Sequence, residues 1–531
     1  MPDESEASNE RAKTVGRAGI VGAGTLLSRL LGLGRDVAVA AYFDRSQTDA
    51  FWIAFTIPNA LRQLLAEGAV TSAVVPILSG KLDTEGDKAA QAFFARARAV
   101  SLLALSLTTI LGVIFSEHLT EAFAAGFHEY PGKFERTRDL TKLVFPYILF
   151  MGTAAMGMAA LNAKRKFAVA AFAPGLLNVA IILAAMVLRV PLADRGIDTV
   201  MALGVGVLLG GALQVAAQLP ALRKMGYLGR PILDLKDKGV RDMLKRILPM
   251  TFGIGIYYID LVVSRRFLSG LGEGAQSYFS WAMRVCDFPQ GIFVMAISTA
   301  QLPSLSSLAA KGNMKELAKT YAHGMRLSMF VAIPASVALV ALGEPLVVLL
   351  FQRGQFDAHA AHQTALALAW QGGAIFTIAA VRQLVPTFYA LGDTRTPVIV
   401  SALDSLVFIG MAVGLRGPFG HIGVSMAIGG STLVQMVLLL IPLRKKLGTI
   451  CASEIGVASA KILAASLVAG IAGRVVANAL DGFSASSIGR MIPGIAGGIA
   501  FAVLYVIAAR IIRVAELDEL IGPIKRKLGR K

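Results

Sequence analysis

Residues 168–189 read AVAAFAPGLLNVAIILAAMVLR, an apolar run whose only charged residue is the final arginine. A helix of about 20 apolar residues spans the hydrocarbon core of a bilayer. Similar runs recur along all 531 residues, and the chain is 55% hydrophobic but only 16% charged. Soluble proteins carry about 25% charged residues. The sequence therefore predicts an all-α polytopic membrane protein, and the continuous runs exclude a transmembrane barrel, whose strands alternate.

About fourteen such runs are bounded by charged or turn residues, and each predicts one membrane-spanning helix. The predicted spans are residues 18–43, 48–79, 91–116, 138–162, 168–189, 197–222, 239–267, 273–308, 316–342, 360–388, 394–415, 420–443, 456–479 and 490–513.

Two segments six helices apart resemble each other: SAVVPILSGKL (72–82) and TAQLPSLSSLA (299–309). Because six is even, the two halves have the same orientation, which indicates parallel repeats around a cleft, as in transporters. Chance similarity of apolar sequence is the alternative. The predicted organisation is a disordered cytoplasmic tail (1–17), an N-lobe (18–222), a C-lobe (239–447), a C-terminal helix pair (456–513) and a basic cytoplasmic tail (514–531).

Lysine and arginine gather in alternate loops, including NAKRK (162–166), residues 223–246, LRKKL (443–447) and the C-terminal tail. By the positive-inside rule these segments face the cytoplasm, so both termini are predicted to be cytoplasmic. The same rule explains the net charge of +18 without nucleic-acid binding. The first apolar stretch is interrupted by charges and predicts a retained helix rather than a cleaved signal peptide.

Known catalytic and metal-binding motifs are absent from the sequence. Cys286 and Cys451 are far apart, and there is no HExxH, GxSxG or GxxxxGK[ST] pattern. Glycine runs such as GVGVLLG (204–210) lie inside apolar stretches and predict helix-packing surfaces rather than phosphate loops. No nucleotide site is visible, so direct use of ATP is not expected.

Charged and polar residues interrupt three of the predicted spans: Arg29, Arg35, Asp36, Asp49, Asn59, Arg62, Glu67, Arg284 and Asp287. One arginine at the bilayer centre costs about 2.5–3.5 kcal/mol on insertion scales. The arginines must therefore either pair with nearby acids or line a hydrated cavity that binds an anion. Four arginines exceed what local pairing requires, which favours the cavity, and guanidinium groups favour phosphate or carboxylate.

The spacing of these residues constrains the geometry of such a cavity. Asn59 and Arg62 share one helix face. Arg29 and Arg35 lie about 240° apart around an ideal helix, so a bend or unwound turn at the intervening glycines is needed to aim both at one cavity. Pro58 and Pro289 predict similar breaks.

The sequence closely resembles the MurJ (MviN) family of lipid II flippases, within the multidrug/oligosaccharidyl-lipid/polysaccharide exporter superfamily. The resemblance rests on SRLLGLGRDVAVAAYF (28–43), TDAFWIAFTIPNALRQLLAEGAVTSAVVPIL (48–78), FPYILFMG (145–152), LNAKRKFAVAAFAPGLLN (161–178), FPQGIFVMAI (288–297), LPSLS (302–306) and FYALGDTRTPV (388–398). It implies fourteen helices, a lipid-tail groove lined by the last pair, and transfer of undecaprenyl-diphosphate-linked disaccharide-pentapeptide across the bacterial inner membrane for peptidoglycan synthesis.

The resemblance also implies roles for individual residues. The family's essential arginines correspond to Arg29, Arg35, Arg62 and Arg284, expected to bind the substrate. Residues expected to gate the cavity or balance its charge are Ser28, Asp36, Asp49, Asn59, Glu67 and Asp287. Two positions depart from the family pattern: Gln63 stands where many members have a second arginine, and Met283 stands where some members have an aspartate beside Arg284.

The expected mechanism is alternating access without covalent chemistry, so the protein is not expected to be an enzyme. Some family members bind sodium, and Asp260, Asp404 and Thr432 are candidate Na⁺ ligands here, since hard cations prefer oxygen. Alternatively, these acids face the cleft or pair with arginines. The membrane potential is an equally plausible energy source. Expected partners are lipid II, membrane lipid and the cell-wall synthesis machinery.

Three alternatives to lipid II transport remain open at this point. The first is a flippase for another undecaprenyl-diphosphate-linked oligosaccharide, of the O-antigen or capsule type. A multidrug antiporter would need acids in the first lobe, where arginines dominate instead. The last is a scaffold or channel that transports no lipid.

Overall fold

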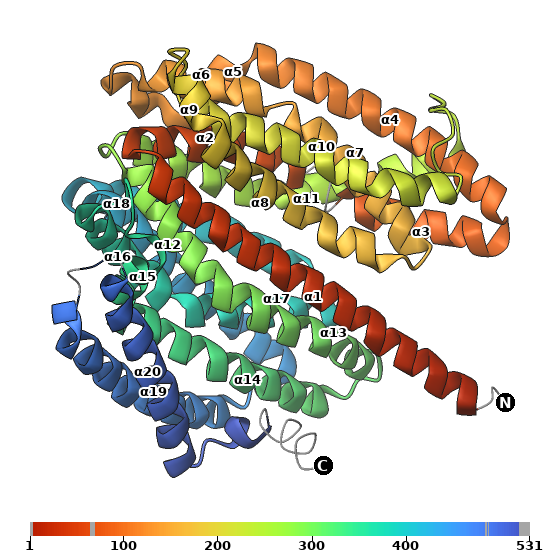
Figure 1. Cartoon of the computed structure of the whole chain (residues 1–531). Helices are drawn as coiled ribbons and strands as arrows, with labels where there is room; N and C mark the ends of the chain where they lie inside the picture. Colours follow the sequence, from red (N-terminus) through yellow and green to blue (C-terminus); the bar gives the residue numbers. More distant parts are fainter. Residues whose placement is uncertain (1–3, 64–68, 484–485, 487, 520–531) are drawn as a thin grey trace. The chain divides into compact units, whose positions relative to one another are not determined.

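The computed structural model describes residues 4–63, 69–483, 486 and 488–519. These residues form helices and short connections, with no β-strand among them (Figure 1). The predicted all-α fold class is therefore confirmed.

The chain divides into two compact units, Met1–Gly270 and Leu271–Lys531. The helices of the first unit are α1 (Glu4–Tyr42), α2 (Arg45–Arg62), α3 (Ala69–Thr84), α4 (Asp87–Ile114), α5 (Ser116–Ala124), the 3-10 helix η2 (Ala125–Glu129), α6 (Lys133–Val144), α7 (Tyr147–Ala163), α8 (Phe167–Val187), α9 (Arg189–Ala193), α10 (Met201–Lys224) and α11 (Lys238–Ser269). Helix α11 belongs to the first unit by its contacts. The lobe boundaries predicted from the sequence, 18–222 and 239–447, stay a prediction.

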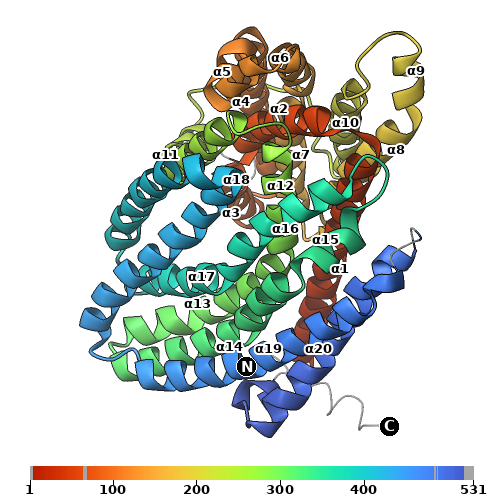
Figure 2. The same cartoon turned by 90° about the vertical axis from the view of Figure 1, so that its left-hand side faces the viewer.

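The helices of the second unit are α12 (Ala275–Pro289), the π-helical turn η3 (Gln290–Val294), α13 (Met295–Ala310), α14 (Met314–Ala341), α15 (Gly343–Phe351), α16 (Ala358–Gly373), α17 (Ile375–Ala390), α18 (Arg395–Leu447), α19 (Ala452–Ala479), η4 (Asp481–Phe483), η5 (Gly489–Met491) and α20 (Ile492–Ile511). Within α18 the backbone leaves the helical region at Gly420, where φ is 57°, so two helices meet there. Figure 2 shows α19 and α20 side by side next to α14.

Each predicted span overlaps one or more helices of the described chain, and residues 64–68 of the span 48–79 lie outside it. Nine segments of the described chain are long and apolar enough to cross a membrane: Asp87–Ile114, Lys133–Ala163, Phe167–Val187, Met201–Lys224, Met314–Ala341, Ala358–Ala390, Arg395–Leu447, Ala452–Phe483 and Gly489–Ile511. The helices outside this set include α1, α2 and α12, which carry the predicted site arginines. The chain is a multi-pass membrane protein, and the total of fourteen crossings stays a prediction.

Two local predictions about the first helix are wrong. We predicted a disordered tail over residues 1–17, but α1 begins at Glu4. This segment is rich in alanine, glutamate, lysine and arginine, which are strong helix formers. We also expected a bend or unwound turn at Gly32 and Gly34, but α1 is helical throughout both positions.

Proline positions gave a mixed outcome. Helix α2 continues through Pro58 without unwinding. Pro289 ends α12, and a π-helical turn follows it at once, as the predicted break requires.

Helix α8 packs between α1 and α10 through close backbone contacts (Figure 1). A Cβ atom built on Gly24 of α1 would lie 2.7 Å from the carbonyl oxygen of Ala171. A Cβ atom on Gly210 of α10 would lie 2.7 Å from the Cα atom of Leu177. The glycine run 204–210 is thus a helix-packing surface, as predicted, because its glycines let the backbones approach.

We predict that Gly210→Ala destabilises the protein by about 1–3 kcal/mol, because the added methyl group forces α10 away from α8. Thermal unfolding of the purified protein in detergent measures this change. The matched control is Gly80→Ala in α3, where nothing lies within 4 Å of the added atom. Equal melting temperatures for the Gly210→Ala variant and the wild type would contradict the close packing.

Candidate functional site

Arg35 on α1 is buried, with 7% of its surface exposed, and its guanidinium group is held from two sides. Its Nε and Nη2 atoms donate to Oδ1 of Asp36 at 2.9 and 2.6 Å. Its Nη1 atom donates to Oδ1 of Asn178 on α8 at 3.1 Å. Asn178 in turn donates from Nδ2 to the backbone carbonyl of Ser28 at 3.0 Å. Two residues of the predicted site, Ser28 and Arg35, therefore contact one amide, and a third, Asp36, contacts Arg35.

The charge at this position is partly balanced. An arginine has five N–H donors, of which these hydrogen bonds use three. One donor on Nη1 and one on Nη2 take no part in them. The sequence analysis gave two hypotheses for Arg35, pairing with a nearby acid and binding an anion. The structure is compatible with both, because Arg35 pairs with Asp36 and has two N–H donors outside these hydrogen bonds.

Arg62 ends α2, and its Nε atom donates to Oδ1 of Asn59 at 3.0 Å, one turn earlier on the same face. The predicted spacing thus gives a direct contact that orients the guanidinium group. Arg29 lies on α1 and is partly exposed. Glu67 lies outside the described residues.

Asp49 is fully buried in α2 and forms an ion pair with a residue that the sequence analysis missed. Its Oδ2 atom lies 2.7 Å from Nζ of Lys133 at the start of α6, and both side chains are at most 1% exposed. The Lys133 ammonium group also lies over the rings of Phe127 and Tyr130, at 4.3 and 4.9 Å from their centroids. Asp49 therefore joins α2 to the α5–α6 region of the first unit.

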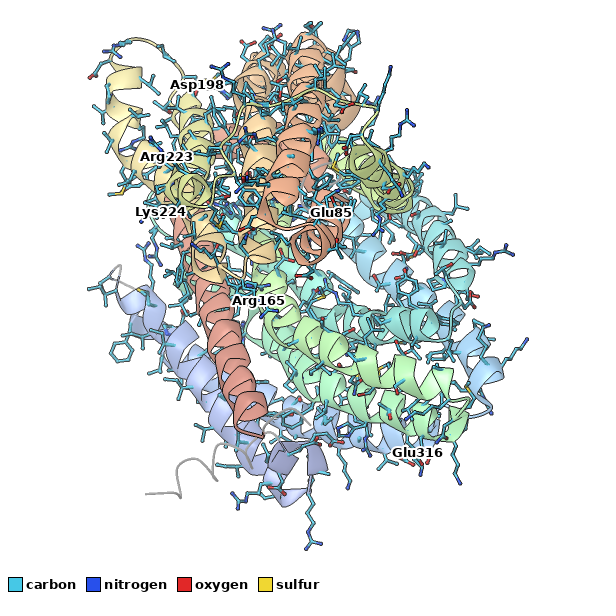
Figure 3. The ribbon with its side chains drawn as sticks, turned by 90° about the vertical axis from the view of Figure 1, so that its right-hand side faces the viewer. Glu85, Arg165, Asp198, Arg223, Lys224 and Glu316 are labelled. Carbon is cyan, nitrogen blue, oxygen red and sulfur yellow. The ribbon has the colours of Figure 1, made fainter. Side chains whose placement is uncertain are left out.

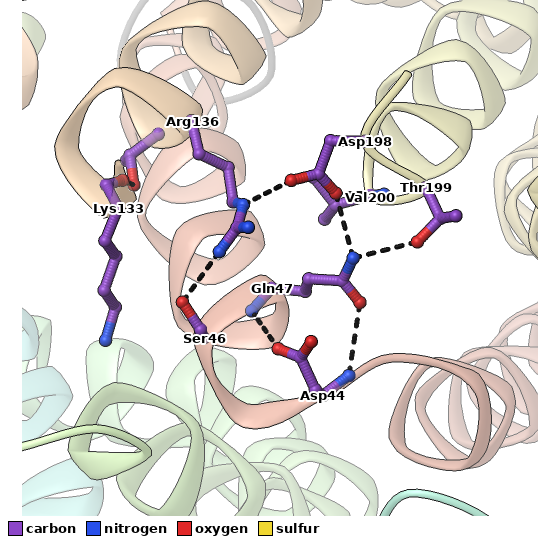
Figure 4. A network of polar contacts seen from close by, with 9 residues as sticks. Asp44, Ser46, Gln47, Lys133, Arg136, Asp198, Thr199 and Val200 are labelled. Carbon is purple, nitrogen blue, oxygen red and sulfur yellow. Dashed lines mark hydrogen bonds and ion pairs between the residues drawn. The ribbon is translucent and has the colours of Figure 1, made fainter. Parts of the chain in front are cut away.

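A second basic residue of α6, Arg136, extends this contact (Figure 4). It donates from Nη1 to the hydroxyl of Ser46 at 2.7 Å and from Nε to the Asp198 carboxylate. Gln47 donates to Oδ1 of Asp198 at 2.9 Å and completes a capping box with Asp44 at the start of α2. Burial acts to raise the pKa of Asp198, but the Val200 amide and the Arg136 guanidinium outweigh it and lower that pKa. The network connects the starts of α2, α6 and α10.

We predict that Lys133→Met destabilises the protein by about 3–5 kcal/mol, because it leaves a buried carboxylate without its partner cation. The double variant Lys133→Met/Asp49→Asn should regain most of this loss, since no charge then stays buried. Thermal unfolding in detergent measures both effects. Lys142→Met is the matched control, because Lys142 is an exposed lysine of the same helix. A Lys133→Met protein as stable as this control would contradict the pairing.

In the second unit, Arg284 lies on α12 with its guanidinium 3.9 Å from the Asp287 carboxylate, and both side chains are more than a third exposed. An exposed pair of this kind is weak.

The predicted sodium ligands Asp404 and Thr432 lie on the two halves of α18. Gln435 donates to the Ser401 hydroxyl across these halves at 3.4 Å. Asp404 lies three residues after Ser401, and Thr432 lies three residues before Gln435, so each shares a helix face with the residue that makes this contact. Asp404 and Thr432 are therefore on the facing sides of the two halves. The Thr432 hydroxyl donates to the Ile428 carbonyl at 2.6 Å, which leaves its oxygen lone pairs for a cation. Asp260 lies on α11 and is partly exposed.

An apolar cavity of about 670 Å³ lies within the second unit, between α14, α17, α18 and α19. Met325, Met329, Phe376, Leu440 and Leu463 are among its lining residues.

The turn between α17 and α18 contains the GDTRTP sequence of the resemblance. Asp393 accepts hydrogen bonds from the hydroxyl and amide of Thr396, at 2.6 and 3.0 Å, and pairs with Lys446 at 3.2 Å. The Thr396 hydrogen bonds, with a smaller contribution from Lys446, lower the pKa of Asp393 to about 2. This motif caps the start of α18 and holds the turn.

The two residues that the sequence analysis missed differ in how visible they were. Asn178 is the one amide in the apolar run 168–189, which is a signal for a buried polar contact. Lys133 lies in a mixed-charge segment and resembles an ordinary loop lysine, so nothing in the sequence marks it as buried.

Comparison with known proteins gives consistent matches. The family model described as "Lipid II flippase MurJ" matches residues 39–488. A protein from Burkholderia cenocepacia described as "Lipid II flippase MurJ" is 35% identical over 438 residues, covering 80% of this chain and 82% of that protein.

Solved structures share the fold. A structure titled "Lipid II flippase MurJ, inward closed conformation" matches with a TM-score of 0.73 at 23% identity, covering 93% of this chain and 99% of that one. An inward-facing multidrug resistance MATE family transporter of the MOP superfamily matches with a TM-score of 0.64 at 16% identity, covering 80% and 95%.

Proposed function

Since the chain belongs to the family described as Lipid II flippase MurJ, we propose that it moves lipid II across the bacterial inner membrane. Lipid II is the undecaprenyl-diphosphate-linked disaccharide-pentapeptide used for peptidoglycan synthesis and cell shape. The observation that carries the proposal is Arg35, a buried guanidinium group held by Asp36 and Asn178 that keeps two donors outside these contacts.

The diphosphate is the part of lipid II that opposes transfer. The prenyl chain is stable in lipid, at about 0.8 kcal/mol per buried CH₂ group, whereas the headgroup carries charge and sugars. Arg29, Arg35, Arg62 and Arg284 would bind the diphosphate. Arginine suits this role because it is permanently charged and donates to phosphate in a forked geometry.

The prenyl chain needs an apolar surface beside the headgroup site. The family resemblance implies a groove along the C-terminal helix pair, and the apolar cavity beside α19 supports an apolar chain in that region.

Transport would follow alternating access, in which the site opens first to the cytoplasm and then to the outer face. The matching solved structures are described as inward closed and inward-facing, which supports a fold with more than one state. Binding, rearrangement and release require no covalent step, so we propose that the protein is not an enzyme.

Basic residues support an orientation with both termini in the cytoplasm. Arg223 and Lys224 end α10, and Arg165 precedes α8, at the opposite ends of these helices from the Asp198 network (Figure 3). By the positive-inside rule, the basic ends face the cytoplasm.

We predict that Arg29→Ala and Arg284→Ala each reduce lipid II transport at least tenfold while the proteins insert normally, because each loses a charge-assisted phosphate contact. The measurement is lipid II translocation in proteoliposomes, with the same vesicles assayed for an O-antigen-type undecaprenyl-diphosphate oligosaccharide.

Arg138→Ala is the matched control, because Arg138 is a partly exposed arginine of α6 and lies outside both the predicted arginine site and the proposed lipid-tail groove. Full activity of both site variants would refute the arginine site. Preferential transport of the O-antigen-type lipid would favour the alternative flippase.

We also propose Na⁺ as a coupling ion, bound through Asp404 and Thr432 with Asp260 as a further ligand. The facing positions of the first two on α18 support this, because a carboxylate and a hydroxyl are ligands that a hard cation prefers. The alternative driving force is the membrane potential, about 2.3 kcal/mol per charge per 100 mV.

We predict that replacing Na⁺ with K⁺ reduces transport by the wild type at least fivefold, because the coupling ion is then missing. Asp404→Asn should remove this dependence, since it removes the carboxylate ligand. Initial translocation rates in proteoliposomes at fixed membrane potential measure both effects. A wild-type rate that is the same in both buffers would exclude sodium coupling.

A further inference from the structure

Asn178 lies in the middle of α8 and is 7% exposed, and both polar atoms of its amide contact α1. The Oδ1 atom accepts from Arg35 at 3.1 Å, and the Nδ2 atom donates to the Ser28 carbonyl at 3.0 Å. A Cβ atom built on Gly32 would lie 3.6 Å from Nδ2, so this glycine faces the amide. Asn178 thus docks on the α1 surface between Ser28 and Arg35.

The amide joins two helices and restrains one side chain. Side chains on a helix tilt toward its N-terminus, so Arg35 extends back along α1 toward Ser28, where the amide meets it. Asp36 holds the Nε and Nη2 atoms, and Asn178 holds Nη1, so the guanidinium plane is restrained at all three nitrogens.

We propose that Asn178 is a positioning residue, which fixes Arg35 in the orientation that binds the diphosphate of the lipid substrate. This inference rests on the proposed function. A restrained guanidinium group loses less conformational entropy on binding than a mobile one, so positioning raises affinity.

The neutral amide has a second consequence. Asp36 already places one negative charge against the guanidinium group. A carboxylate at position 178 would keep an acceptor for Arg35 but add a second negative charge facing the phosphate. An amide therefore holds the arginine without cancelling its charge, which makes the choice of asparagine specific for anion binding.

The test is a double-mutant cycle on the full chain in lipid nanodiscs, with lipid II as the probe and the dissociation constant as the readout. We expect Asn178→Leu to weaken binding about tenfold in the wild type, the range for a hydrogen bond to a charged group. In an Arg35→Ala background, Asn178→Leu should cause no further loss of affinity, because Arg35, through which Asn178 acts, is absent.

Two further variants separate positioning from simple packing. Gln214→Leu replaces a buried amide of α10 that is 1% exposed, and it should leave the dissociation constant unchanged. Asn178→Asp keeps the side-chain shape and should still weaken lipid II binding, an effect that helix packing alone does not produce. Asn178→Ala, which removes the amide without adding a charge, carries the same cycle if the Asn178→Leu protein does not fold.

The possible outcomes separate a failure of the positioning role from a failure of the proposed function. Equal loss of binding from Asn178→Leu with and without Arg35 would show a packing role and overturn the inference. The inference is also overturned if Arg35→Ala weakens binding but the position-178 variants do not. If Arg35→Ala itself leaves lipid II binding unchanged, the proposed role of Arg35 in substrate binding fails, and the inference fails with it.

Discussion

A guanidinium group buried in an apolar protein needs polar partners, and in the first unit this requirement shapes the contact between α1 and α8. An unpartnered arginine at the bilayer centre costs a few kcal/mol even on the most favourable scales. Arg35 meets the requirement through Asp36 on its own helix and Asn178 on α8. The contact with Asn178 also holds α1 against α8. The same hydrogen bonds therefore stabilise the Arg35 charge and the packing of the two helices.

The glycine-mediated packing of α8 makes this arrangement achievable. Gly24 lets α1 approach α8, and Gly210 lets α10 approach the other side of the same helix. Short side chains such as asparagine reach a neighbouring helix only when the backbones are close. Close packing and polar contact therefore depend on each other in this part of the fold.

The start of α2 shows a second way to place charge in an apolar protein. Lys133 neutralises Asp49 in full burial, while Arg136 and Asp198 form a more exposed network beside them. A buried pair contributes little net stability but is costly to break, so it favours one register of α2 against α6. Asp49 thereby contributes to the structure of the unit, and the proposed anion-binding role rests on the arginines.

The sequence alone determined the helical fold, the approximate helix positions, the glycine packing surface and the contact between Asn59 and Arg62. These features depend on hydrophobicity, residue size and short spacings, which the chain carries locally. Only the tertiary structure decided that α1 stays helical through Gly32, that Lys133 is buried against Asp49, and that Asn178 meets Arg35. The last two depend on side chains from distant segments, 84 residues apart for Asp49 and 143 for Arg35. A partner at that distance has no local signature, because it is helix packing that brings the two groups within hydrogen-bonding range.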